Sequence, residues 1–406
     1  MYRLLLKVIS SSGGGVIVNI LLYPFIINIF SPMEYGEFSL FLVPLTIVVV
    51  FANFKMDLVI VSANKQDLTR MFRLSIIFAL YVSIVGAALS VIYYKMIGVD
   101  DLFKIYLLSN VYVFSYVVIQ LATAFYIRAD KIGIASLLLF YQSSAIGVFQ
   151  LILSMTSLRT DALVYGSVLA PFSALIIILI FERDIRGCFK VKFSDAIKEV
   201  RYNKDITYYA TGQNIINSLS VSLVLIIINY IGGTNIAGVY SLASKILVIP
   251  CRVVSSAVRQ TFTSYLSGFD IKIQIKKVYK LSIFIFLIST LIYLAVLLSL
   301  NFGILEYLNV DPKWLKINEF SIYISIWLVA VVGCSPFISL MTVYKNNKQY
   351  MKFEIVNLFT RILIGMMIIF LGFGYNDYII VVNILGAIFY MLLSIAIVRK
   401  IENENS

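Results

Sequence analysis

The sequence contains no histidine, which excludes the commonest metal ligand, the usual proton shuttle and any Ser-His or Cys-His catalytic arrangement. Cysteine is scarce as well: Cys188, Cys251 and Cys334 stand far apart, without the spacing of a zinc site or a disulfide framework. A GxxxxGK loop for nucleotide phosphates is also missing, so the chain is not expected to hydrolyse ATP. We therefore expect no cofactor and no enzymatic activity.

Charged residues are the next scarcity. Only 13% of the 406 residues are Asp, Glu, Lys or Arg, whereas an average soluble domain has about 25%. Hydrophobic residues make up 61% of the chain, and the mean hydropathy is +0.94. This composition predicts an all-α polytopic membrane protein. The formal net charge of +12 does not indicate nucleic-acid binding, because basic residues that flank membrane spans usually set topology.

Twelve apolar stretches are long enough to cross a bilayer. A polar, basic linker at residues 182–206 separates the first six from the last six and is expected to lie on the inner leaflet. We therefore predict a six-helix lobe at 1–181 and a second at 207–406. The spans are expected at 10–30, 37–62, 72–97, 104–127, 132–154, 162–181, 207–230, 236–261, 280–301, 318–343, 353–372 and 378–398.

The distribution of basic residues predicts the orientation. With both termini placed in the cytoplasm, 23 of the 33 Lys and Arg residues fall in cytoplasmic segments and five fall in external segments. Cytoplasmic loops carry such an excess of Lys and Arg in membrane proteins. The remaining five basic residues lie inside spans.

Two similar segments lie 202 residues apart. EYGEFSL at 34–40 and IAGVYSL at 236–242 share the pattern Gly-x-aromatic-Ser-Leu near the start of the second span of each half. Six spans is an even number, so both halves enter the membrane from the same side. This predicts two lobes related by a pseudo-two-fold axis along the membrane normal, with a site between them.

Three cations in the eighth span, Lys245, Arg252 and Arg259, are spaced seven residues apart. Seven residues is almost two helical turns, so the three side chains project from one face. Each charge in the hydrocarbon core costs roughly 2.5–3.5 kcal/mol on insertion scales, which predicts that this face looks into protein or water. Lys245 and Arg252 are interpreted as lining a substrate cavity; pairing with helix carbonyls is the alternative.

Arg361 in the eleventh span is a further cationic candidate. Four cations inside or near the spans indicate an anionic cargo, and arginine suits phosphate because its planar fork binds two oxygens. Gln213, Asn214 and Asn217 in the seventh span could contact sugar hydroxyls, or could instead hold helices together.

Lys55 and Asp57 lie near the cytoplasmic end of the second span, and we expect Asp57 to be the one acidic residue inside the spans. Asp57 corresponds to Arg259 at the 202-residue offset. An ion pair between them would form a cytoplasmic gate; the alternative is that both side chains simply reach the membrane interface. The C-terminal half is thus expected to hold the anion and the N-terminal half to supply the acid.

These features together resemble an O-antigen flippase of the Wzx type, in the multidrug/oligosaccharidyl-lipid/polysaccharide exporter superfamily. The similarity covers the whole chain and depends on the two halves, the two glycine motifs, FKMDLVIV, IPCRVVSSAVRQTF and the YIRADK turn. It implies transport of undecaprenyl-diphosphate-linked oligosaccharide across the bacterial inner membrane by alternating access, with proton or sodium coupling, in lipopolysaccharide biosynthesis. It also implies a polysaccharide polymerase and a chain-length regulator as partners.

The sequence departs from the pattern of this superfamily in two places. SLSVSLVLI at 218–226 lacks the acidic residue followed by Arg that members often carry in the seventh span, and Ser264 stands where a proline is common. Asp57 is then the expected ion site. Two alternatives stay open: a drug or metabolite antiporter of the same superfamily, and a membrane polysaccharide polymerase or ligase. Acidic cavity residues would indicate the first, and a large external loop with catalytic basic residues the second.

Overall fold

The computed structural model describes residue 18 and residues 21–181, 191–266, 271–301, 311–343 and 347–404. Within these ranges the regular structure is entirely helical. The helices form two compact units. The N-terminal unit contains the described residues up to Ile29 together with Phe38–Leu219, and the C-terminal unit contains Phe30–Glu37 and the described residues from Ser220 onward. The predicted all-α polytopic class is confirmed.

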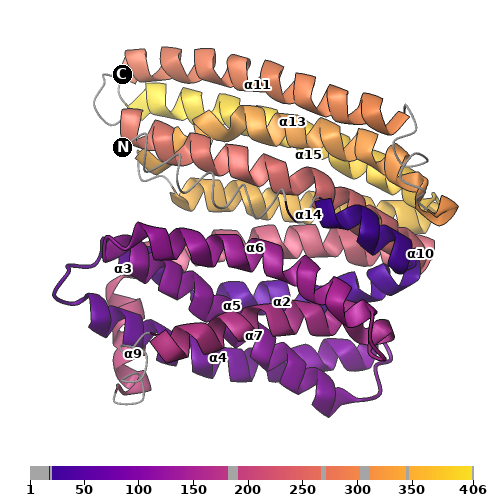
Figure 1. Cartoon of the computed structure of the whole chain (residues 1–406). Helices are drawn as coiled ribbons and strands as arrows, with labels where there is room; N and C mark the ends of the chain where they lie inside the picture. Colours follow the sequence, from indigo (N-terminus) through magenta and orange to yellow (C-terminus); the bar gives the residue numbers. More distant parts are fainter. Residues whose placement is uncertain are drawn as a thin grey trace. The chain divides into compact units, whose positions relative to one another are not determined.

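The N-terminal unit is built from antiparallel helices with short connections (Figure 1). α6 packs on α7, α4 packs on α5, and α5 packs on α7. Stacked rings of Phe72 and Phe125, 4.5 Å between centroids, lie in the core where α4 and α5 meet. Its helices are residues 21–29, most of α2 (Pro32–Asn53), α3 (Met56–Ser62), α4 (Leu68–Met96), α5 (Leu102–Arg128), α6 (Ile132–Ser154), η1 (Arg159–Asp161), α7 (Ala162–Phe181) and α9 (Phe193–Tyr202).

In the C-terminal unit, α11, α13 and α15 lie side by side, with α14 against α15 (Figure 1). α10 consists of two helices that meet at Gly233, where the backbone is not helical and the φ of 79° suits glycine. Its first turns, up to Leu219, belong to the N-terminal unit. The elements are α10 (Lys204–Leu266), α11 (Ile271–Asn301), η3 (Pro312–Trp314), α13 (Lys316–Val343), α14 (Asn347–Leu371) and α15 (Tyr375–Glu404).

Ten helical segments among the described residues are long and apolar enough to span a membrane. The predicted seventh and eighth spans fall in one of these segments, Thr207–Val248, but the non-helical backbone of Gly233 divides it into two helices, so the break lies within the predicted connection 231–235. Residues 10–17, 19 and 20 of the predicted first span lie outside the described residues. The placement of both termini in the cytoplasm and the division at the linker stay predictions.

The described part of the linker forms the amphipathic helix α9. Its apolar side packs on α4, where Phe193 contacts Tyr81 at 4.5 Å between ring centroids, and Ala196 and Val200 are buried. Thr207 at the start of the next span donates a hydrogen bond to the Val200 carbonyl oxygen at 2.9 Å. The basic connector is therefore anchored to protein through its apolar face.

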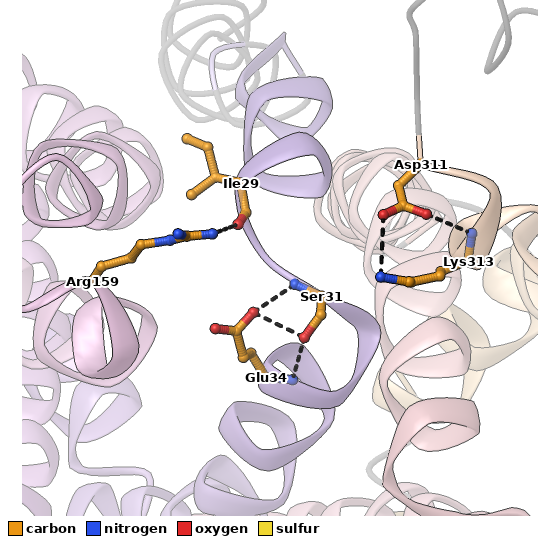
Figure 2. A network of polar contacts seen from close by, with 6 residues as sticks. All are labelled: Ile29, Ser31, Glu34, Arg159, Asp311 and Lys313. Carbon is orange, nitrogen blue, oxygen red and sulfur yellow. Dashed lines mark hydrogen bonds and ion pairs between the residues drawn. The ribbon is translucent and has the colours of Figure 1, made fainter.

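The start of α2 is fixed by a capping box (Figure 2). The Ser31 amide donates to the Glu34 carboxylate at 2.7 Å, and the Glu34 amide donates to the Ser31 hydroxyl at 3.3 Å. Pro32 follows at the first helical position, where no N–H is needed. Separately, in the N-terminal unit, Arg159 donates to the Ile29 carbonyl oxygen at 3.0 Å.

The two glycines of the repeated motif meet where α2 and α10 cross. A methyl group built on Gly36 would clash with the Thr234 backbone, and one built on Gly238 would clash with the Pro32 backbone and lie 2.8 Å from the Gly36 amide nitrogen. Pro32 and Thr234 are themselves 202 residues apart, so the contacts are reciprocal. Reciprocal contact is what a two-fold axis produces, which supports the predicted symmetry at this crossing.

Candidate substrate and coupling sites

Lys245 lies in the C-terminal unit, half-buried, on the α10 segment that follows the glycine crossing. Its ammonium sits over the Tyr35 ring, 4.9 Å from the ring centroid. Tyr35 in turn meets Trp314 edge to face at 6.0 Å, and both rings are buried. A cation over an aromatic face is stabilised by the ring quadrupole. The start of α2 therefore supplies the aromatic support for a cation of α10.

Arg361 is buried in the middle of α14, where the residue is 6% exposed. Its guanidinium lies over the Trp327 ring at 5.5 Å and donates to the Ser220 carbonyl oxygen at 3.3 Å. Gly386 gives this stack room, because a methyl group there would lie 3.0 Å from the Trp327 ring. The guanidinium is thus held by α10 and α13, with α15 leaving space for it.

A small cavity of about 170 Å³ between α14 and α15 borders Arg361, Asn357 and Thr360. Ligand pockets usually measure ~300–1,000 Å³, so this cavity is too small for an oligosaccharide. In this structure Arg361 contributes positive charge from a buried position.

Glu354 was not expected as a site residue. It lies inside the described span Tyr350–Leu371 and is 0% exposed. One carboxylate oxygen accepts a hydrogen bond from the Tyr390 hydroxyl at 3.4 Å, while the other is buried without a hydrogen-bond partner among the described residues. The expectation that Asp57 is the one acidic residue inside the spans is therefore wrong. The N-terminal half is not the only source of an intramembrane acid.

Glu354 and Arg361 are seven residues apart on α14, which places them on the same face of the helix. The same spacing singled out the cations of α10. Glu354 stands at the edge of the predicted span 353–372, and the sequence analysis did not select it. The structure begins the span at Tyr350 and packs α15 over the carboxylate.

The remaining predicted site residues are distributed over both units. Arg252 and Arg259 lie on α10, but their side chains are outside the described residues, so the gate between Asp57 and Arg259 stays a prediction. Gln213 and Asn214 are half-buried and Asn217 is exposed; all three belong to the N-terminal unit. Lys245 and Arg361 belong to the C-terminal unit. The predicted amide residues and the predicted cationic residues therefore belong to different units.

Lys55 and Asp57 lie where the second span is interrupted, between α2 and α3. Both are half-buried, and no ion pair joins them in the described part of the chain. Nearby, the Asn53 side chain donates to Gln120 at 2.7 Å. Sequence reasoning selected Asp57 from its charge but gave no sign of the helix break.

A family model described as "Polysaccharide biosynthesis protein" matches residues 27–301, which is more than half of the chain. The chain belongs to this family. No curated protein matches the sequence.

Solved structures establish the fold of this polysaccharide biosynthesis protein. It is similar to an inward-facing multidrug resistance MATE family transporter of the MOP superfamily, with a TM-score of 0.70, 13% identity, and coverage of 98% of this chain and 96% of the other. It is similar to the lipid II flippase MurJ in an inward closed conformation, with a TM-score of 0.69, 13% identity, and coverage of 96% and 88%.

A third similar structure is a MOP superfamily transporter from Pyrococcus furiosus whose binding pocket is described as having reverse polarity. Its TM-score is 0.62 at 12% identity, with coverage of 98% and 96%. At such identities the likeness concerns the fold. The fold that the sequence resemblance implied is confirmed, and the family match places this chain in polysaccharide biosynthesis.

Proposed function

We propose that this protein is a flippase that moves an undecaprenyl-diphosphate-linked oligosaccharide, the repeat unit of O-antigen or a similar surface polysaccharide, from the cytoplasmic to the periplasmic leaflet of the bacterial inner membrane. The family membership supplies the polysaccharide context. The observation that carries the proposal further is the pair of cations inside the C-terminal unit, Lys245 and Arg361, each over an aromatic ring.

The charge of these groups suits the proposed cargo. A diphosphate is an anion, and cationic groups away from bulk water attract it more strongly than they would at the surface. Lys245 is half-buried and would contact the diphosphate directly, together with Arg252. Arg361, which donates a hydrogen bond to the Ser220 carbonyl oxygen, would add positive potential without contacting the diphosphate. Gln213, Asn214 and Asn217 of the N-terminal unit would contact sugar hydroxyls.

Alternating access by rocking of the two halves would carry the glycan across while the lipid tail stays in the bilayer. A polysaccharide polymerase and a chain-length regulator would act on the delivered unit.

A proteoliposome assay with labelled undecaprenyl-diphosphate-linked oligosaccharide tests the proposal. Lys245→Gln is expected to lower the flipping rate by roughly 10- to 100-fold, because a charge-assisted hydrogen bond contributes about 1.5–3 kcal/mol. Lys280→Gln, which removes an exposed lysine of the same unit, is the matched control and is expected to flip at the wild-type rate. Wild-type protein that fails to flip the lipid but transports an organic cation would instead support the antiporter alternative.

A further inference from the structure

Arg361 is a buried cation of the C-terminal unit that has no carboxylate partner among the described residues. The residue is 6% exposed and lies inside the span Tyr350–Leu371. No ion pair joins its guanidinium to an Asp or Glu side chain in the described part of the chain. Glu354, on the same face of α14, accepts a hydrogen bond from the Tyr390 hydroxyl instead. Burying a charge is costly unless a counter-charge and hydrogen bonds accompany it, which favours an anion beside Arg361.

Two buried N–H groups at this position have no acceptor among the described residues. Arg361 donates through Nη1 to the Ser220 carbonyl oxygen at 3.3 Å, but its Nε is buried and unpaired. The indole Nε1 of Trp327, whose ring centroid lies 5.5 Å from the guanidinium carbon, is buried and unpaired as well. Buried polar groups are normally hydrogen-bonded. Guanidinium and indole nitrogens can only donate, so the partner that suits both groups is an acceptor.

Gly386 of α15 leaves room for such a partner. A methyl group built on Gly386 would lie 3.4 Å from Trp327 Nε1 and 3.7 Å from Arg361 Nη2, so the indole and the guanidinium approach the same point from two helices. The cavity of about 170 Å³ between α14 and α15 is bordered by both Gly386 and Arg361. Because a water molecule takes up ~30 Å³ in the liquid, this volume is enough for a small ion with a few waters.

We propose that Arg361, Trp327 and the cavity beside Gly386 form a binding site for one small monovalent anion of the halide class, such as chloride. The anion would accept hydrogen bonds from the guanidinium and the indole and would neutralise the buried charge. All three residues belong to the C-terminal unit, so the site lies within one compact unit.

The charge and the walls of the cavity favour a halide over a phosphate or a water molecule. One guanidinium supplies one positive charge, which a monovalent anion balances, whereas a phosphate dianion would leave a negative charge among side chains such as Leu385 and Leu392. A water molecule would satisfy the hydrogen bonds but not the charge. The hydroxyl of Thr360, also at the cavity, already donates to the Val356 carbonyl oxygen at 2.9 Å.

Anion binding here would regulate transport, and that consequence rests on the proposed function. There Arg361 supplies positive potential that attracts the diphosphate. A bound anion cancels this charge, so the anion-free form is expected to attract the cargo more strongly. The binding itself does not depend on the cargo, and it can be measured on the purified full-length protein without any glycan.

Tryptophan fluorescence can report on this site because the chain has only two tryptophans, Trp314 and Trp327. Trp314→Phe leaves Trp327 as the single reporter. Iodide quenches an indole that it contacts, so the detergent-solubilised variant is titrated with iodide, and gluconate keeps the ionic strength constant. Quenching is expected to include a saturable component, and chloride is expected to relieve that component by competition. Radioactive chloride binding to the wild type, expected to be saturable, gives a second readout that needs no substitution.

Three variants in the Trp314→Phe background test the site. Arg361→Gln is expected to abolish the saturable quenching, because it removes the charge that holds the anion. Gly386→Ala is expected to weaken the apparent affinity about tenfold or more, because the added methyl group takes up space beside both donors. Lys280→Gln, which removes an exposed lysine of the same unit, is the matched control and is expected to be quenched as the parent is.

The absence of saturable chloride binding to the wild type, or saturable quenching that persists in Arg361→Gln, would overturn the proposal. Gel filtration establishes that each variant is folded. Should Arg361→Gln aggregate, Gly386→Ala decides, since an unchanged affinity in that variant is also contradictory. A protein that binds chloride but does not flip the lipid-linked glycan refutes the proposed function alone. A protein that flips the glycan but has no chloride site refutes this inference alone.

Discussion

The glycine crossing of α2 and α10 makes a sharp prediction for Gly238→Ala. The added methyl carbon would lie 2.8 Å from the Gly36 amide nitrogen and closer still to the Pro32 carbonyl oxygen, whereas ordinary contacts begin near 3.4 Å. Both obstacles are backbone atoms, which cannot rotate away, so the helices must separate by more than half an ångström. Overpacking of this kind costs typically ~1–3 kcal/mol.

The substitution also gains helix propensity, worth about 1 kcal/mol for glycine to alanine in a helix interior. Because backbone clashes place the cost at the upper end of the range, the net loss in the free energy of unfolding is expected to be about 2 kcal/mol. The midpoint of thermal denaturation in detergent should then fall by a few degrees, as roughly 2 °C per kcal/mol is usual for larger domains.

Gly133→Ala is the matched control for the same chemical change. A methyl group on Gly133, in the first turn of α6, would have no neighbouring atom within 4 Å. Its denaturation midpoint is expected to equal or exceed that of the wild type. If Gly238→Ala denatures at the same temperature as Gly133→Ala, the argument from close helix approach is refuted. Gly36→Ala should lower the midpoint as Gly238→Ala does, and the double variant should lose less than the sum, because one separation relieves both clashes.

Two further predictions concern charge. Arg361→Met is expected to destabilise the protein by about 1.5–3 kcal/mol in thermal denaturation, since it removes the charge-assisted hydrogen bond to the Ser220 carbonyl oxygen and the contact with the Trp327 ring; an unchanged midpoint would contradict this. At the surface, the Lys65 ammonium donates a hydrogen bond to the Asp130 carboxylate and lowers the pKa of that carboxyl. The pair therefore stabilises the fold at any pH above the pKa that Asp130 has in the unfolded chain. This stabilisation is lost as the pH falls through the pKa that Asp130 has in the folded protein. Asp130→Asn should therefore reduce the acid-side decline of thermal stability slightly, because the pair is exposed; an unchanged pH profile would contradict this role.

The spans could be predicted because membrane-spanning backbone must satisfy its hydrogen bonds within each helix, which requires long apolar runs that are visible in the sequence. The glycine motif was equally visible, and its recurrence 202 residues later predicted the relation between the two halves. The sequence did not indicate that Gly36 and Gly238 meet each other. It did not show either that the connection between the seventh and eighth spans narrows to a kink at Gly233, because glycine is compatible with both a loop and a kink.

The candidate sites were harder to predict from the sequence, because they depend on contacts between residues far apart in the chain. The break at Phe54 depends on rings from α4 and α10, which no local pattern reveals. The burial of Glu354 depends on where α14 begins and on Tyr390 of α15. The seven-residue spacing from Glu354 to Arg361 was available as a signal, because it is the same spacing that identified Lys245 as one of a set.

The reciprocal contacts at the glycine crossing have a consequence for the ancestry of the chain. Where one residue packs against a second residue of the other copy and the two equivalent positions make the same contact in return, the contact is isologous, as in a symmetric dimer of two identical subunits. Gly36 against Thr234 and Gly238 against Pro32 preserve this arrangement within one polypeptide. In a dimer of two identical half-length subunits, one substitution would alter both sides of such a contact at once. Fusion into a single chain frees each copy to change separately, so that Lys245 could arise opposite a half that has Val43 at the equivalent position while the crossing beside it stayed symmetric.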